Sequence, residues 1–377
     1  MRAVYIVSDN ILSPVGNTSE ANFKNLCDGI SGIRLRNDAA LSDQPVYASL
    51  FDDLSFSKAG DSYTKFEKLL IASVEDALKN TAVKADDAGT VLIVSSTKGN
   101  ISLIESNTGI KELKQKVSLG YSANLVAKHF KFISEPIVVS HACISGLVAI
   151  ITAMRLLQSG KYDHAVVAGA DIITKFILSG FQSFQAISAE PCKPFDGKRN
   201  GITLGEGAAT VVLSINKPVH GNSFKITGGA VSNDANHISG PSRTGEELYQ
   251  AINAAMKESG AGRDDIDFIS AHGTATMYND EMEARAINLA DMGHIPLNSL
   301  KGYYGHTLGA AGLIETVISL QSLKENVVLP TLGYTEPGTT KTVNVLNSLK
   351  KGDIKNCLKT ASGFGGCNAA IILQKEV

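Results

Sequence analysis

The chain has 377 residues, of which 44% are hydrophobic, and its formal net charge is −2. This length allows one very large core or two domains. The nearly balanced charge gives no indication of nucleic acid or an anionic membrane as the main partner. Five widely spaced cysteines without a CxxC pair exclude a disulfide framework and a zinc site of that type. We therefore expect a reducing, cytoplasmic environment.

The first part of the chain predicts a strand, an irregular segment and a helix. The N-terminal MRAVYIVSDN indicates a short strand and not a signal peptide, because no long apolar segment follows its basic residue. Residues 30–60 are polar and rich in turn-forming residues, which is typical of a surface excursion. The spacing of Phe66, Leu70 and Val74 predicts a helix over 63–80. Further elements are expected as strands at 91–95, 137–139, 165–168, 208–217, 267–270 and 369–377, and as a helix at 246–259.

Alternating strands and helices indicate an α/β architecture with covered sheets. The PVHGNS segment predicts a linker between an N-terminal half, 1–218, and a C-terminal half, 223–377. The two halves show a similar order of elements without a clear residue repeat. The most apolar helical segment contains Arg155, so no membrane-spanning helix is predicted.

Cys143 lies between a β-branched strand and a nearly all-apolar helix that should end at Gly160. At a helix N-terminus, unpaired N–H groups and the helix dipole favour an anion, by about one pKa unit at most. This arrangement suits a nucleophilic thiolate. The alternative is a small buried hydrophobic residue, which is the ordinary role of a free cysteine.

Three further sites lie at strand or turn ends, where open α/β folds present reactive groups. They are His272 in SAHGTAT, His306 in YYGHTLGAAG, and Phe364 in the turn GFGG. Each also has an ordinary explanation. A histidine beside glycine and threonine can cap a helix, and a glycine-rich turn can simply require a positive φ.

Taken together, these motifs resemble those of the β-ketoacyl-[acyl carrier protein] synthases, decarboxylating condensing enzymes of the thiolase superfamily. The chain looks like a diverged member of their elongating, Cys-His-His type. The resemblance covers nearly the whole chain and rests on six segments in order: ILSPVGNTSEANFKNLCDGISGI, HACISG, PCKPFDGKRNGITLGEGA, HGTATMYNDEME, KGYYGHTLGAAG and GFGGCN. It implies a thiolase-like fold, in which two similar α/β halves form a five-layered αβαβα arrangement. It also implies a homodimer, or pairing with a related subunit.

The resemblance implies decarboxylative condensation of an acyl group on Cys143 with a malonyl thioester on acyl carrier protein. The backbone N–H groups of Cys143 and Phe364 would form the oxyanion hole, and Phe364 would also gate the site. His272 and His306 would stabilise the malonyl enolate, His306 as a neutral imidazole because a helix follows it. In the alternative, one histidine acts as base for Cys143.

Two charged residues near His306 are assigned to the catalytic surroundings by the same resemblance. They are Lys301 and Glu315, and because a lone buried charge is costly, we expect them to pair. No metal, nucleotide or flavin is expected. The implied prosthetic group is the phosphopantetheine of the acyl carrier protein.

Short hydroxyl side chains match the family residues that bind the phosphopantetheine arm. These are Thr274, Thr276 and Ser239, for which ordinary turn chemistry is the alternative. Asp280 and Glu283 also match the family, but acidic residues in a first helical turn favour a structural role.

The chain departs from the family pattern at several positions. His141 stands where relatives commonly have threonine, and a structural or pocket-shaping role is expected for it. Cys367 replaces the threonine after GFGG, which resembles the second reactive cysteine of thiolases, although HGTAT argues against a thiolase. Ser362 stands where many relatives have a gating phenylalanine, and Asn200 replaces an aspartate. These departures favour a specialised pathway.

Three other functions remain open at this point. The chain could be a thiolase-type acyltransferase that acts without decarboxylation. It could be a non-catalytic chain-length subunit, although the presence of Cys143 speaks against this. It could also be a Cys–His hydrolase that transfers the acyl group to water. The acyl chain length and the choice between fatty acid and polyketide or polyene synthesis are not predicted by the sequence.

Overall fold

The computed structural model describes residues 2–55, 57–60, 62–106, 113–218, 222–235 and 240–376. Its main sheet consists of two sets of strands, one from each half of the chain. The two sets are joined by a short antiparallel pairing between their first strands, in which Tyr5 pairs with Lys225 and Ile6 with Phe224. The N-terminal set is β1 (Tyr5–Leu12), β4 (Thr90–Ser95), β5 (Ile137–Val139), β6 (His164–Asp171) and β8 (Gly207–Ser214). The C-terminal set is β9 (Ser223–Asn233), β10 (Phe268–Ser270), β11 (Pro296–Asn298), β15 (Asn356–Gly363) and β16 (Cys367–Glu376), with β13 (Asn344–Val345) at the edge.

The two sets repeat one topology. In space the N-terminal strands run β1-β8-β6-β4-β5, and the C-terminal strands run β9-β16-β15-β10-β11. In each set the first two neighbouring pairs are antiparallel and the last two are parallel. An internal structural repeat is therefore present although the residues show no clear repeat.

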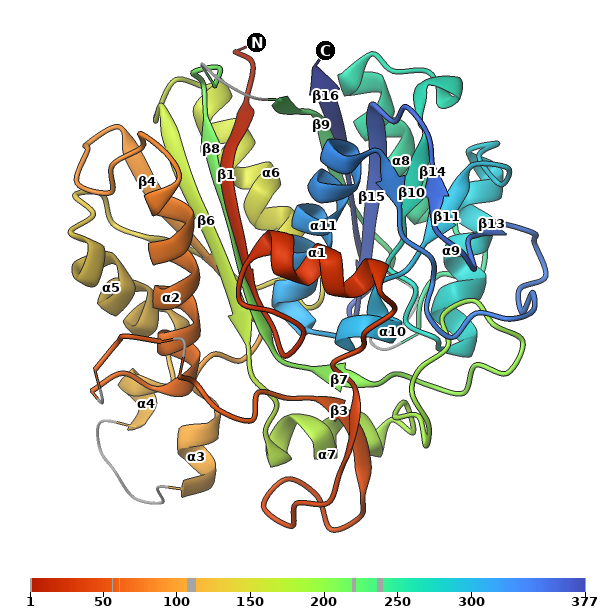
Figure 1. Ribbon diagram of the computed structural model, residues 1–377, viewed down its shortest axis with the longest axis horizontal. Coiled ribbons are helices and arrows are strands. Elements are labelled where there is room, and N and C mark those ends of the chain that lie inside the picture. The colour runs from red at the N-terminus through yellow and green to blue at the C-terminus, as the bar shows by residue number, and fades with distance from the viewer. Residues whose placement is uncertain are drawn as a thin grey trace.

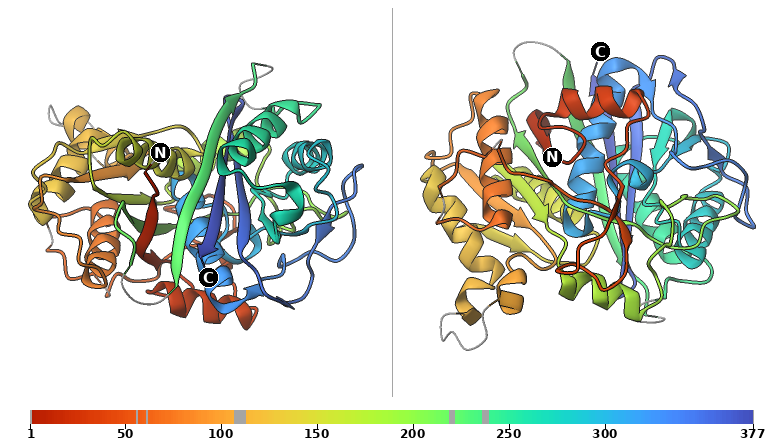
Figure 2. Two further views of the ribbon diagram at one scale, coloured as in Figure 1. Left: turned by 90° about the horizontal axis from the view of Figure 1, so that it is seen from above. Right: turned by 60° about the horizontal axis from the view of Figure 1, so that its bottom comes forward.

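Helices cover the sheets on both outer faces and fill the space between them (Figures 1 and 2). The outer helices are α2 (Lys65–Lys79) and α5 (Leu119–Phe130) on one side and α8 (Glu246–Ser259) and α9 (Met277–Leu289) on the other. The central helices are α6 (Ser145–Gln158) and α11 (Ala311–Glu325). This is the five-layered αβαβα arrangement expected from the sequence.

The two central helices approach each other closely through glycine. All residues of α11 from Ala311 to Leu323 are buried, as expected for a helix enclosed on all sides. A Cβ atom added at Gly146 would lie 2.8 Å from the backbone nitrogen of Leu313, which real Cβ atoms do not tolerate. Because α6 follows Cys143 and α11 follows His306, this contact fixes the distance between the two halves of the site.

The predicted surface excursion at 30–60 is only partly correct. It contains β2 (Arg34–Arg36) and β3 (Val46–Ser49), which form a small sheet with β7 (Leu204–Gly205). Leu41 and Val46 in this segment are buried. These strands could not be predicted from the sequence because they are short and because β7, the partner of β3, lies far along the chain.

The remaining elements are short connections. They are α1 (Ser19–Cys27), α3 (Ser102–Ser106), α4 (Leu113–Lys116), α7 (Lys175–Ser183), α10 (Lys301–Tyr304), η1 (Arg263–Asp265), η2 (Leu308–Ala310), β12 (Val327–Val328) and β14 (Lys350–Lys351). Among the described residues, no helix is both long and apolar enough to cross a membrane.

Candidate active site

Cys143 lies in a tight turn between β5 and α6, as its flanking residues predict. Ala142 has a φ of 45°, a left-handed conformation that is costly for a residue with a Cβ atom. The hydroxyl of Ser145 stabilises the turn, because it accepts from the N–H of His141 at 2.8 Å and donates to the carbonyl of Ala142 at 2.6 Å. Cys143 is 8% exposed, and α6 begins two residues later.

His272 lies just after β10 in a loop that two buried carboxylates hold. Glu283 accepts from the backbone N–H groups of His272 at 2.8 Å and Gly273 at 2.6 Å. Asp280 accepts from the N–H of Thr274 at 2.9 Å. Asp280 and Glu283 therefore have the structural role that the sequence favoured, and it is a role in shaping the site.

His306 follows α10, and its backbone N–H donates to the carbonyl of Thr203 at 2.6 Å. Its ring meets that of His272 edge-on, with ring centroids 5.1 Å apart and planes at 84°. The sulfur of Cys143 and one ring nitrogen of each histidine all lie within 4.8 Å of one another. Within the described part of the chain, no other group of three or more cysteine, histidine, aspartate or glutamate side chains is close enough to hold a metal ion.

Both histidines are neutral in this environment. Burial lowers the pKa of His272 and of His306 well below the usual value, and the positive charge of Lys301 lowers both further. The neutral form of His306 was expected from the dipole of a following helix. The structure gives a different cause, since η2 intervenes between His306 and the start of α11.

The expected lowering of the Cys143 pKa is wrong. Burial, followed by the proximity of Cys367, raises the pKa of the Cys143 thiol to about 12. Lys301 and a hydrogen bond from the backbone of Phe364 act in the opposite direction but do not compensate. The thiol is therefore protonated in the free protein, because desolvation outweighs the effect of a helix N-terminus.

Lys301 and Glu315 form the buried ion pair expected from the sequence. Sequence reasoning missed a third member of this group, Lys359, whose Nζ lies 2.7 Å from Glu315 Oε2. The Lys359 ammonium group also donates to the backbone carbonyls of Ser270 at 3.1 Å and Thr360 at 2.6 Å. The sequence feature that could have identified Lys359 is its position as the single charged residue of the strand NCLKTASG.

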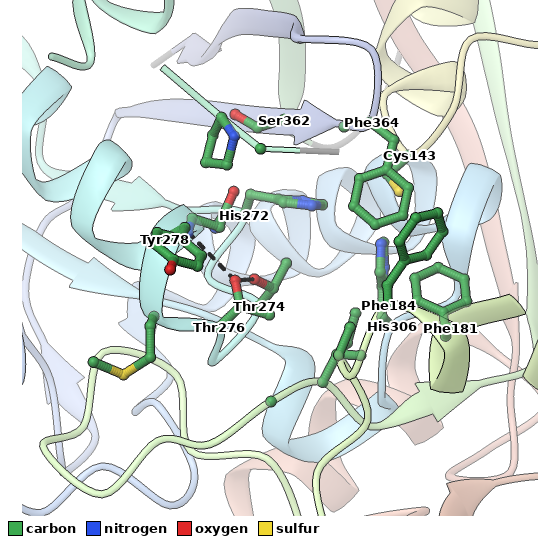
Figure 3. Close-up of a pocket in the computed structure, with 18 of the residues that line it drawn as sticks. Cys143, Phe181, Phe184, His272, Thr274, Thr276, Tyr278, His306, Ser362 and Phe364 are labelled. Atoms are coloured by element: carbon green, nitrogen blue, oxygen red, sulfur yellow. Dashed lines mark hydrogen bonds between the residues drawn. The ribbon is translucent and has the colours of Figure 1, made fainter. Parts of the chain in front are cut away.

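A cavity of about 450 Å³ opens onto Cys143, His272 and His306 (Figure 3). Thr274 and Thr276 line it and hydrogen-bond each other at 2.9 Å. Thr276 also accepts from Asn279 N–H as the N-cap of α9, so the ordinary role of a short hydroxyl is present as well. Ser239 lies outside the described residues. The segment directly after it, 240–242, lines the cavity, as do Asn200 and Ser362.

A second cavity, of about 870 Å³, meets the first at Cys143. Phe364, Phe181 and Phe184 line both cavities. The Phe364 ring stacks on Phe181 at 5.7 Å and meets Phe184 edge-on at 5.5 Å, so the three rings form a partition beside the thiol (Figure 3).

The backbone of the glycine-rich turn packs directly on Cys143. A Cβ atom added at Gly363 would lie 3.0 Å from both the backbone nitrogen of Cys143 and the sulfur of Cys367. The Cys367 thiol donates to the Phe364 carbonyl at 3.3 Å and so braces this turn. His141 contributes through its backbone, while its side chain is exposed.

A buried thiol, two neutral imidazoles and an adjoining apolar cavity on a thiolase-like fold define an acyl-transferring enzyme. Two family models match the chain: "Beta-ketoacyl synthase, N-terminal domain" at residues 1–217 and "Beta-ketoacyl synthase, C-terminal domain" at residues 224–335. The chain belongs to the β-ketoacyl synthase family.

Curated relatives and solved structures agree with this assignment. The 3-oxoacyl-[acyl-carrier-protein] synthase 2 of Vibrio cholerae is 30% identical, with 99% of each chain covered. The enzyme of the same name from Rhizobium meliloti is 28% identical over 100% of this chain and 99% of its own. A ketosynthase solved with its chain length factor from Xenorhabdus doucetiae is 25% identical, with a TM-score of 0.87 and coverage of 100% and 98%. A β-ketoacyl synthase from Burkholderia phymatum, 23% identical and fully covered on both sides, has the same fold with a TM-score of 0.90.

Proposed function

We propose that the chain is a 3-oxoacyl-[acyl carrier protein] synthase. It would condense an acyl group held on Cys143 with malonyl-[acyl carrier protein], with loss of carbon dioxide, in fatty acid or polyketide-type synthesis. The observation that carries this proposal is the convergence of Cys143, His272 and His306 where two cavities meet. One cavity suits the incoming thioester, and the other suits the acyl chain.

In the first step, Cys143 attacks the acyl thioester of a carrier protein. Because its thiol is protonated in the free protein, its proton must leave during the attack, and the neutral imidazoles are within reach. The backbone N–H groups of Cys143 and Phe364 are proposed to stabilise the oxyanion. The carrier thiol leaves, and the acyl chain enters the 870 Å³ cavity behind the phenylalanine partition.

In the second step, a malonyl thioester occupies the 450 Å³ cavity. The bond to its carboxylate breaks, carbon dioxide leaves, and negative charge develops on the thioester oxygen. His272 and His306, both neutral, are proposed to donate N–H groups to that oxygen. The carbanion then attacks the acyl carbonyl, a C–C bond forms, and the Cys143 thiolate leaves and takes up a proton from solvent, because its original proton left with the carrier thiol in the first step. Lys301, paired with Glu315, is proposed to hold the His272 loop in place through its hydrogen bond to the His272 carbonyl.

This chemistry requires no resident cofactor. The phosphopantetheine of an acyl carrier protein would carry the substrate along the first cavity, where Thr274 and Thr276 are proposed to bind it. The same role stays a prediction from the sequence for Ser239. Among the structural neighbours, one ketosynthase is in complex with a chain length factor, and another is described with its acyl carrier protein. We propose that this chain likewise binds an acyl carrier protein and a second subunit, identical or related.

The test combines a panel of acyl carrier thioesters with malonyl-[acyl carrier protein]. Carbon dioxide release, the condensed product and the mass of the intact protein are measured together. We expect acyl mass on Cys143 and a β-ketoacyl product, both lost in Cys143→Ser and both retained in the control Cys27→Ser, which alters a partly buried cysteine. Condensation without carbon dioxide release would identify a thiolase, and free acid alone a hydrolase. Absence of any acyl mass would favour a non-catalytic subunit.

A further inference from the structure

Two buried lysines donate hydrogen bonds to the backbone at the end of β10, directly before the loop that contains His272. The Nζ of Lys359 donates to the carbonyl of Ser270 at 3.1 Å and lies 3.4 Å from that of Ala271. The Nζ of Lys301 donates to the carbonyl of His272 at 3.0 Å. Three successive carbonyl groups thus meet two ammonium groups, and Lys359 and Lys301 are 0% and 1% exposed.

Two buried carboxylates act on Lys359: burial lowers the pKa of its ammonium group, and the charges of Glu315 and Glu283 act in the opposite direction. Glu315 is paired with both lysines, one at each oxygen. A buried ion pair is weak evidence for stability, because apolar residues that replace the whole pair are often neutral or stabilising, so we ask what else the second buried lysine does. Lys359 stands beside Ser270 on the neighbouring strand β15, which places its charge next to the His272 loop.

The charged and titratable groups that face His272 come from four directions. Lys301 and His306 lie on one side, Glu283 accepts from the His272 backbone on another, and Cys143 faces the ring across the cavity. Lys359 lies on the adjacent strand β15, opposite Ser270. Burial is the largest cause of the low pKa of His272, and Lys301, His306 and Lys359 lower it further, in that order.

We propose that Lys359 is a positioning residue for His272, which fixes the end of β10 and, through its buried charge, opposes a positive charge on the imidazole. This inference rests on the proposed function, in which His272 acts as a neutral donor to the malonyl enolate. Lys359 acts through His272 and does not itself face either cavity. Its charge keeps the donor form available even when the surroundings become acidic.

The test compares Lys359→Met, Lys359→Gln and a matched control, Lys375→Met. Lys375 also donates its Nζ to a backbone carbonyl in the C-terminal half, that of Leu323 at 3.0 Å, but it lies at the far end of β16. Diethyl pyrocarbonate acylates an imidazole in its neutral form and not in its protonated form. Its reaction at His272, measured by peptide mass spectrometry from pH 5 to 7.5, therefore reports the protonation of His272 without requiring activity. Added N-acetylhistidine corrects for the reactivity of the reagent.

In the wild type and in Lys375→Met, labelling of His272 should stay nearly complete at pH 5. In both Lys359 variants it should fall about twofold at pH 5, which corresponds to a shift of about one pH unit when nine-tenths of the wild-type His272 is neutral there. Lys359→Gln retains a donor for the Ser270 carbonyl, so it separates the loss of charge from the loss of the hydrogen bond. The acid limb of malonyl decarboxylation should move by the same amount, while the rate at pH 8 changes less.

The inference is overturned if the Lys359 variants match Lys375→Met in the labelling of His272 at pH 5. It is equally overturned if they match Lys375→Met in the acid limb of malonyl decarboxylation. It is also overturned by the wild type alone if His272 is already protonated at pH 5, so the result does not depend on whether a variant folds. A wild type that labels as expected but releases no carbon dioxide from malonyl-[acyl carrier protein] contradicts the proposed function instead.

Discussion

The two active-site histidines should be required to load the nucleophile as well as to handle the malonyl group. Burial raises the pKa of Cys143 from 9.0 to about 12. At pH 7.5 this leaves roughly one thiolate in thirty thousand molecules, about a thousandfold fewer than at the usual pKa, and the difference corresponds to about 4 kcal/mol. A helix N-terminus offsets at most about 2 kcal/mol of this. The proton must therefore be removed by a neighbouring base as the thiol attacks.

We expect the double variant His272→Ala/His306→Ala to load an acyl group on Cys143 at least about a hundredfold more slowly at pH 7, since general base catalysis contributes 10²- to 10⁴-fold. The single variants show which imidazole takes the proton: the base is the one whose loss slows loading more. The assay is single-turnover loading from an acyl thioester, followed by intact-protein mass spectrometry between pH 6 and pH 10. His129→Ala, at an exposed histidine on α5, is the control.

In the double variant, loading should rise about tenfold for each pH unit, because only preformed thiolate reacts. The reasoning fails if the double variant loads at the wild-type rate with no dependence on pH. That result would mean that Cys143 is already ionised and that its surroundings stabilise the thiolate more than its burial opposes it.

The remaining predictions concern stability and the partition between the cavities. His272→Gln should make stability less dependent on pH: the folded-state pKa of His272 is depressed, so its contribution is present above pH 6.5 and is lost at lower pH. Between pH 6.5 and pH 5 the wild type should lose up to about 2 kcal/mol more than His272→Gln in chemical denaturation. Phe364→Ala should cost less than about 1 kcal/mol in stability, because the ring is 38% exposed, yet release more free acid from acylated Cys143 as water enters through the opened partition. An unchanged rate of hydrolysis would argue against the partition. Gly146→Ala should destabilise the protein by about 1–3 kcal/mol, because its methyl group would meet the backbone of α11; a variant of wild-type stability would show that the helices can separate without cost.

The sequence alone placed the reactive residues on the right local structures. Apolar patterning located the helix after Cys143 and predicted α8 at its observed bounds, because hydrophobic periodicity is a local property of the chain. The pairing of Lys301 with Glu315 followed from the cost of burying an isolated charge. The roles proposed for these residues, and the division of the chain at 218–223, stay predictions.

Tertiary structure decided what depends on contacts between distant segments. It showed that the two halves share one strand topology, that β3 pairs with β7, and that Lys359 joins the ion pair beneath His272. It also reversed the expected protonation of Cys143, since the depth at which a group is buried is set by residues from the whole chain. Motifs identify which groups meet, but desolvation and through-space charge, which exist only in the folded protein, determine the protonation state in which they meet.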